Sequence, residues 1–197
     1  MTSGRYGIVL AALLAVPIAV PLSARADAFV TTLGTTPFAA CAKAAAEAKR
    51  TGVGTRAALA VCDQAIATWP SPPIEMVTAY VNRSVVQLAL AHVAAAIVDT
   101  SAAIRLNPAL AEAYLDRGIA LSTQHRNEAA IEDFSRALAL HLGRPELAYF
   151  DRAMAREDSG DIKGAYLDYR QAAALSPAWD KPRLELARFT VVRAPAS

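Results

Sequence analysis

The chain has 197 residues, with 20 lysines and arginines against 18 aspartates and glutamates, and 54% of its residues are hydrophobic. Much of that hydrophobic share is alanine, glycine is scarce at 9 residues, and the alternating Val/Ile/Thr runs that form strands are absent. The composition argues against a β-sheet protein and favours an all-α fold of one or two domains.

The first 26 residues have the pattern of a secretory signal peptide. Arg5 precedes an apolar run from Ile8 to Val20, and Ala24-Arg25-Ala26 matches an A-x-A cleavage site. An uncleaved membrane anchor is the alternative, but the apolar run is shorter than the ~20 residues of a spanning helix and includes proline. We expect cleavage after Ala26, a periplasmic or secreted protein, and membrane contact only through the uncleaved peptide.

Cleavage would also change the charge of the protein. It removes Arg5 and Arg25 and no acidic residue, so the formal charge of the remaining 171 residues is 0 instead of +2. A neutral chain lacks the basic surface that nucleic-acid binding requires. We therefore expect no nucleic-acid partner.

The chain after the cleavage site begins with a short leader, residues 27–37, and a predicted helical hairpin. An alanine-rich segment starts near Phe38 and ends at Gly52 and Gly54, where helices commonly stop. A second segment starts at Thr55, a suitable N-cap, and ends before Pro70.

Cys41 and Cys62 lie one on each helix of this hairpin. In an exported protein, two cysteines on adjacent antiparallel helices favour a structural disulfide, and two buried free thiols are the alternative. A metal site is disfavoured because no histidine lies near either cysteine in sequence and two ligands do not close a site.

The rest of the chain repeats with a period of 34 or 35 residues. Tyr80, Tyr114 and Tyr149 mark equivalent positions, and each is followed three residues later by arginine. A fixed period of this size is typical of a solenoid of helix pairs, in which each unit buries its apolar face against its neighbours. The array should cover residues 38–193, with units at about 38–70, 77–108, 111–142 and 146–177.

The repeat resembles the tetratricopeptide repeat (TPR) family. That family's unit has an aromatic residue, a small residue four positions later, alanine and an aromatic residue in the second helix, a further alanine and a closing proline. The third unit matches with Tyr114, Gly118, Ala130, Phe134 and Ala137. The first hairpin matches weakly and has Cys62 at the second aromatic position. The resemblance implies a right-handed α-solenoid of antiparallel helix pairs.

Residues 180–192 should form a closing helix. Pro182 suits a helix start, and the apolar residues Leu184, Leu186, Phe189 and Val192 follow it. A solenoid needs such a cap because its last unit would otherwise expose an apolar face.

Each clear unit has an arginine followed by an aspartate 16 residues later. The pairs are Arg83 with Asp99, Arg117 with Asp133 and Arg152 with Asp168. Repeated contacts to a ligand are one interpretation. We favour an ion pair that braces each helix pair, with the small contribution of ~0–1 kcal/mol that is typical of exposed pairs.

An enzyme is not expected. His92, His125 and His141 lie at or near predicted helix ends, and no two share a helix at a spacing of four residues. The chain has no Gly-rich phosphate loop, no G-x-S-x-G and no H-E-x-x-H motif. We therefore expect neither catalysis nor a cofactor or metal, and the functional site should be a binding surface.

The TPR resemblance implies a concave groove formed by the first helix of each pair. Its lining would be Val81, Val85, Leu88, Leu115, Ile119, Ser122, Phe150, Met154 and Glu157. Their i, i+4 and i+7 spacing places each set on one helix face. Asn82, Asp116 and Asp151 would lie beside them and form an acidic edge.

Such a groove would suit an extended or helical segment with apolar anchors. It lacks the Lys/Arg/Asn set with which some family members bind a peptide's terminal carboxylate. The alternative is that the lining residues pack between the first helices or under the leader or the tail.

Two hypotheses for function follow. The first is a non-catalytic scaffold or adaptor in the periplasm that binds another protein or a peptide segment through the groove. The alternative is a structural envelope subunit that associates with itself and has no dedicated peptide ligand, because alanine-rich faces and a neutral surface are compatible with subunit packing.

Overall fold

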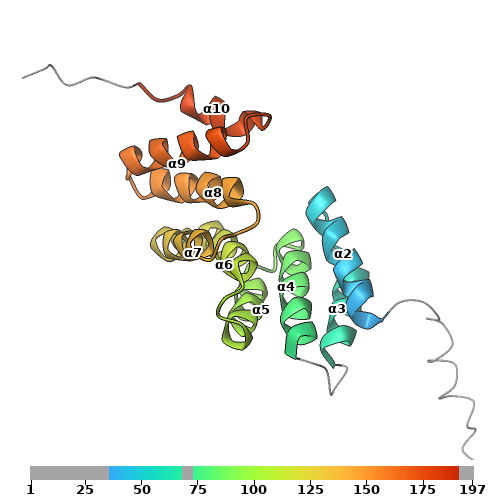
Figure 1. Cartoon of the computed structure of the whole chain (residues 1–197). Helices are drawn as coiled ribbons and strands as arrows, with labels where there is room; N and C mark the ends of the chain where they lie inside the picture. The colour runs from blue at the N-terminus through green and yellow to red at the C-terminus, as the bar shows by residue number, and fades with distance from the viewer. Residues whose placement is uncertain (1–35, 68–72, 191–197) are drawn as a thin grey trace, which may run out of the picture. The chain divides into compact units, whose positions relative to one another are not determined.

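The computed structural model describes residues 36–67 and 73–190. Within these residues the regular structure is nine α-helices and no strand (Figure 1). They are α2 (Pro37–Thr51), α3 (Arg56–Ala67), α4 (Pro73–Ala89), α5 (Val93–Leu106), α6 (Ala111–Thr123), α7 (Asn127–Ala139), α8 (Pro145–Asp158), α9 (Ile162–Leu175) and α10 (Asp180–Leu186). The predicted signal peptide and all but the last two residues of the predicted leader lie outside the described residues.

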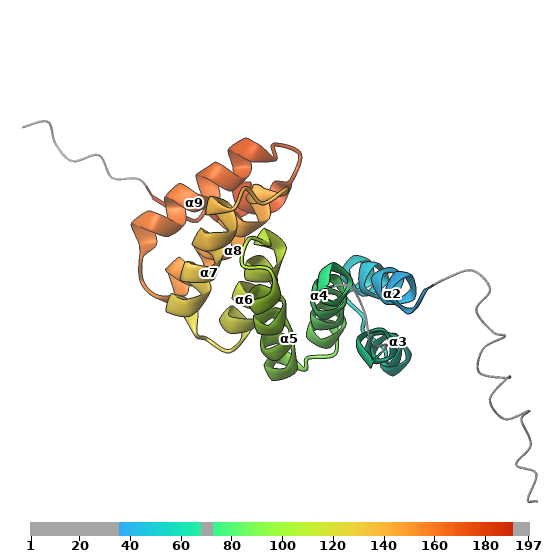
Figure 2. The same ribbon diagram turned by 60° about the horizontal axis from the view of Figure 1, so that its bottom comes forward.

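The helices form consecutive pairs that stack in chain order. Within the pairs, α2 packs on α3, α4 on α5, α6 on α7 and α8 on α9, and α10 packs on α9. The second helix of each pair packs on the first helix of the next, as Figures 1 and 2 show. First helices also contact each other, α2 with α4, α4 with α6 and α6 with α8. The predicted α-solenoid of helix pairs is confirmed.

Several helices begin and end at residues suited to the role. Gly52 ends α2 with a φ of 71°, and the Thr55 hydroxyl accepts a hydrogen bond from the Ala58 N–H at 3.0 Å at the start of α3. At the equivalent turn of a later pair, His125 has a φ of 56°. A residue with a Cβ is strained in that conformation, whereas glycine is not.

The residues that carry the repeat pattern are packing residues. In the third pair, Ala130, Phe134 and Ala137 are fully buried. A Cβ added at Gly118 would lie 2.6 Å from the Phe134 ring, so only glycine lets α6 and α7 approach this closely. The small residue four positions after the tyrosine is therefore required by the aromatic residue of the second helix.

A disulfide replaces the aromatic residue in the first pair. The Sγ atoms of Cys41 and Cys62 are 2.06 Å apart, and both residues are fully buried. This agrees with the predicted pairing. With a sequence separation of 21, the crosslink stabilises the folded chain by about 3 kcal/mol in the chain-entropy model.

The three predicted Arg–Asp pairs are formed. In each pair, the arginine Nε and Nη2 donate hydrogen bonds of 2.6–2.8 Å to the two oxygens of one carboxylate. Each arginine also lies over the tyrosine three residues before it, at 5.3–5.8 Å from Cζ to the ring centroid. The Tyr-x-x-Arg motif is therefore a structural element of each pair.

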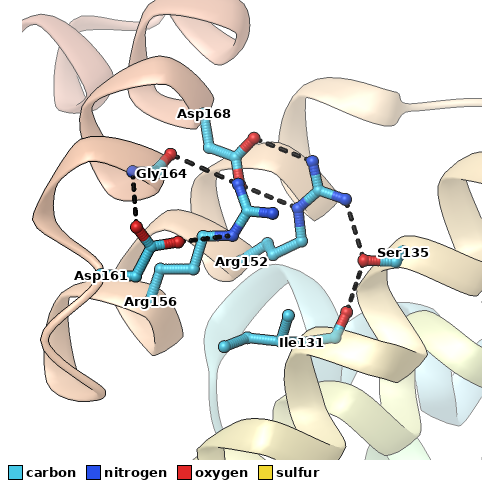
Figure 3. A network of polar contacts seen from close by, with 7 residues as sticks. All are labelled: Ile131, Ser135, Arg152, Arg156, Asp161, Gly164 and Asp168. Carbon is cyan, nitrogen blue, oxygen red and sulfur yellow. Dashed lines mark hydrogen bonds and ion pairs between the residues drawn. The ribbon is translucent and has the colours of Figure 1, made fainter.

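The remaining arginine nitrogen connects each helix pair to the one before it. The acceptors of Nη1 are Asp63 Oδ1 for Arg83 (2.8 Å), Ser101 Oγ for Arg117 (3.4 Å) and Ser135 Oγ for Arg152 (2.9 Å). Figure 3 shows the last of these contacts, in which the Ser135 hydroxyl also donates to the Ile131 carbonyl. We call the three Arg–Asp pairs, together with these contacts to the preceding pair, the arginine ladder.

The arginine ladder is more buried than the sequence suggested. Asp99, Asp133 and Asp168 are only 2–6% exposed, so the comparison with exposed surface pairs was wrong. The hydrogen bond to Asp99 raises the pKa of the Arg83 guanidinium above its ordinary value. Loss of an arginine would leave a buried carboxylate without a counter-charge, which is far more costly than loss of a surface pair.

The closing helix is shorter than predicted. α10 ends at Leu186 instead of continuing to 192, and the β-branched run at 190–192 has low helix propensity. Aromatic rings complete the cover of the last pair. Trp179 lies 4.8 Å from Phe150, and Phe189 lies 5.9 Å from Tyr169, between ring centroids.

Candidate binding groove

A cavity of about 160 Å³ lies between the first helices of the third and fourth pairs. Its lining comes from α6, α7 and α8 and consists of Ile119, Ser122, Thr123, Phe134, Asp151 and Met154. Three of the predicted groove residues line this cavity, namely Ile119, Ser122 and Met154. Asp151, predicted at the acidic edge of the groove, also lines it. We call this cavity the α6/α8 pocket.

The α6/α8 pocket has an apolar floor and an open rim. Phe134 is fully buried, whereas Met154 is 46% exposed. The Thr123 hydroxyl donates to the Ile119 carbonyl at 2.9 Å, so its proton is used within α6. The apolar surface of Ile119 and Met154 is available to an incoming aliphatic group, beside the Asp151 carboxylate.

Leu115 and Phe150 were predicted to face a partner but are core residues. Leu115 is 4% exposed and belongs to the same apolar cluster as Phe134. Phe150 is 9% exposed, and its ring contacts the rings of Tyr169 and Trp179. Large apolar side chains at these positions are stabilised by removal from water between neighbouring helices, so the packing alternative applies to both.

Other predicted groove residues also have contacts within the chain. Val81 packs in a cluster with residues of α5 and α6, and Val85 packs against the cluster that contains the disulfide. Glu157 forms an ion pair with Arg188 at 2.7 Å. Leu88 is half-buried. Among the predicted residues, the open part of the groove is thus the α6/α8 pocket.

Two aspartates of the first helices have no hydrogen bond or ion pair to another described residue. Asp116 on α6 and Asp151 on α8 occupy equivalent repeat positions, 35 residues apart. Asp116 is 5% exposed, while Asp151 is partly buried and lines the α6/α8 pocket. Burial raises the pKa of both carboxyls to about 6, against weaker lowering by Lys49 for Asp116 and Lys181 for Asp151.

Sequence reasoning placed these two carboxyls at the groove edge but missed their isolation. Asp116 directly precedes Arg117, which looks like a local charge pair in the sequence. Neighbouring helical residues point in different directions, and Arg117 binds Asp133 of the next helix instead. Asp151 and Arg152 repeat this arrangement. The recurring Asp-Arg dipeptide was the available signal.

A larger cavity than the α6/α8 pocket lies elsewhere in the described residues. It measures about 520 Å³, lies on the first helix pair and is lined mainly by alanines of α2 and α3. It contains none of the predicted groove residues. The described residues also contain no group of three or more side chains suited to a metal ion, and none of their helices has the length and apolar character to cross a membrane.

The fold has close counterparts among solved structures. The Arabidopsis OM64 TPR domain is 24% identical, with a TM-score of 0.57, over 59% of this chain and 96% of that domain. A crystal structure of MamA is 19% identical, with a TM-score of 0.58, over 66% of this chain and 72% of that one. The fold is that of a TPR array.

A third TPR structure contains a ligand. The second TPR domain of human RPAP3, solved with the HSP70 peptide SGPTIEEVD, is 22% identical over 59% of this chain and 97% of that domain, with a TM-score of 0.56. No model of a protein family and no curated protein matched the chain. Identities at this level establish the TPR fold, and the function has to be argued from the groove.

Proposed function

We propose that this TPR array is a non-catalytic scaffold, exported to the periplasm or secreted, that binds a segment of another protein in its groove. The observation that carries the proposal is the α6/α8 pocket, in which the exposed Met154 and the half-buried Ile119 of successive first helices flank one apolar floor. The RPAP3 domain, which has a similar fold and was solved with a bound peptide, also supports the proposal.

The pocket can be tested without disturbing the core. Leu115 is buried and therefore unsuitable, so we choose Met154→Lys, with Leu167→Lys on α9 as the control. The two side chains are 46% and 49% exposed, and Leu167 does not line the pocket. Crosslinking in the intact producing cell should yield a discrete adduct with a second protein that Met154→Lys removes and Leu167→Lys retains. An adduct that persists in both variants would contradict a groove partner.

Export is tested separately by protein sequencing. The chain recovered from the periplasmic or culture fraction should begin at Asp27, which follows the proposed cleavage site. A chain that keeps residue 1 and stays with the membrane fraction would favour the anchor. This result would leave the groove proposal untouched.

Self-association is the second candidate function. The observation that favours it is the alanine-lined cavity of the first helix pair, beside which Val53 is 62% exposed. Small side chains allow close helix contacts between subunits. Sedimentation equilibrium of the purified chain distinguishes the candidates: a stable oligomer that Ala44→Glu dissociates supports self-association, and a monomer with an open groove supports the scaffold.

A further inference from the structure

The α6/α8 pocket combines two surfaces that suit different parts of one side chain. Its accessible apolar surface comes from Ile119 and Met154, beneath which the Phe134 ring is buried, and its polar wall includes the carboxylate of Asp151. An aliphatic stem packs well on the first surface, and a cationic head group satisfies the second. Lysine and arginine are the protein side chains with both parts.

Asp116 supplies a second, independent observation. Four aspartates of the described residues are at least nine-tenths buried, and three of them bind arginines of the ladder. Asp116 is the fourth; it is 5% exposed, and no described residue forms a hydrogen bond or an ion pair with it. Its oxygens are not among the fully enclosed unpaired atoms of the described residues, so the carboxylate keeps a small contact with the surface, and a cation bound there would supply the missing counter-charge.

The two lysines of the described residues that attract these carboxylates do not fill this role. Lys49 at the end of α2 and Lys181 on α10 attract Asp116 and Asp151 electrostatically, but neither forms an ion pair with them. Both lysines are exposed. Glu112, one turn before Asp116, adds negative potential on the same helix. The charge left uncompensated in the groove is negative.

Building on the groove function proposed above, we infer that the partner segment is recognised through a lysine or arginine side chain. Its stem packs against Ile119 and Met154, and its head group donates to the Asp151 carboxylate. A second basic group of the same segment binds at Asp116, the equivalent position one repeat earlier. The occupant is thus a basic stretch of another protein, selected by charge complementarity.

The test uses a phage library of random dodecapeptides selected on the purified chain. We expect the enriched peptides to contain lysine or arginine. Replacing the basic residue of a selected peptide by norleucine, which keeps the stem and removes the charge, should weaken binding about tenfold or more. Asp151→Asn should cause a similar loss, because either change removes one partner of a charge-assisted hydrogen bond.

A control separates local recognition from general charge. Asp158→Asn removes the same charge from an exposed position about two turns further along α8. It should change affinity less than threefold. A loss in this control equal to that in Asp151→Asn would overturn the site in favour of long-range attraction.

The remaining outcomes distinguish the two proposals. Selected peptides that lack basic residues, bind Asp151→Asn normally and lose affinity for Met154→Lys would overturn the cation site and leave the groove function standing. Both proposals would be overturned if no peptide could be selected and the crosslinked adduct persisted in the Met154 variant. Asp151→Asn is expected to fold because it removes a buried charge without changing the size of the side chain.

Discussion

The buried aspartates of the second helices have arginine partners, whereas Asp116 and Asp151 of the first helices do not. Asp99, Asp133 and Asp168 are buried, and each accepts two hydrogen bonds from an arginine of its own pair. Asp116 and Asp151, which directly precede two of those arginines, have no such partner. The repeat supplies enough arginine to neutralise only one of the two carboxyl sets.

This difference distinguishes aspartates that stabilise the helix pairs from aspartates that can bind a partner. A carboxyl with a bidentate arginine partner holds two helices in register, and its charge is already compensated within the protein. A buried carboxyl without a partner lowers stability, and such unfavourable features are expected at binding sites. We therefore assign the second-helix aspartates to the arginine ladder and the first-helix aspartates to recognition.

Breaking the arginine ladder should have the largest effect. Arg117→Met leaves Asp133 buried and without its counter-charge, so we expect the free energy of unfolding to fall by about 3–5 kcal/mol. Urea denaturation at pH 7.5 measures this. Arg50→Met, which removes an exposed pair with Glu47, should change the value by less than about 0.5 kcal/mol. Equal effects of the two changes would mean that the ladder sets register without adding stability.

Neutralising the first-helix carboxyls should change the free energy of unfolding in the opposite direction, so that it rises. The pKa of Asp116 and of Asp151 is raised by burial to about 6, from 3.8, so the folded state favours the protonated form. The contribution of this raised pKa to the stability of the folded state is fully present below pH 3.8 and is lost as the pH rises through about 6. Asp116→Asn should therefore stabilise the protein by roughly 2 kcal/mol at pH 7.5 and have little effect near pH 4.

Denaturation of Asp116→Asn and Asp151→Asn at several pH values between 4 and 7.5 tests this expectation. Asp158→Asn, which removes an exposed carboxyl, should show no comparable gain. A gain that is independent of pH would point to packing of the amide instead of the removal of charge. A loss of stability at neutral pH would show that these carboxyls have a stabilising partner, which would contradict the comparison.

The links between neighbouring pairs should contribute the smallest effect. Ser135 accepts a hydrogen bond from Arg152 at 2.9 Å, whereas the equivalent contact from Arg117 to Ser101 is 3.4 Å long. We expect Ser135→Ala to lower the free energy of unfolding by about 1 kcal/mol, and Ser101→Ala to lower it by less. The same urea titrations measure both. A larger loss for Ser101→Ala would show that hydrogen-bond length does not rank these links.

The helix pairs and their packing residues could be predicted from the sequence. The 34- and 35-residue spacing of tyrosines, the small residue at Gly118 and the aromatic at Phe134 are local or periodic features, and each repeat tests the others. The pairing of Cys41 with Cys62 followed from their positions on adjacent helices. The length of the closing helix could not be predicted as well, because helix ends depend on tertiary contacts such as those of Phe189.

The repeat, the helical solenoid and the aspartate partners of the ladder arginines follow from residue spacing along the chain. Which first-helix residues remain open depends on how distant helices pack. Leu115 and Phe150 share the spacing of Ile119 and Met154, yet they are buried by neighbouring helices and by Trp179. Burial and charge compensation depend on what packs from distant segments, and the isolation of Asp116 and Asp151 is a consequence of that packing.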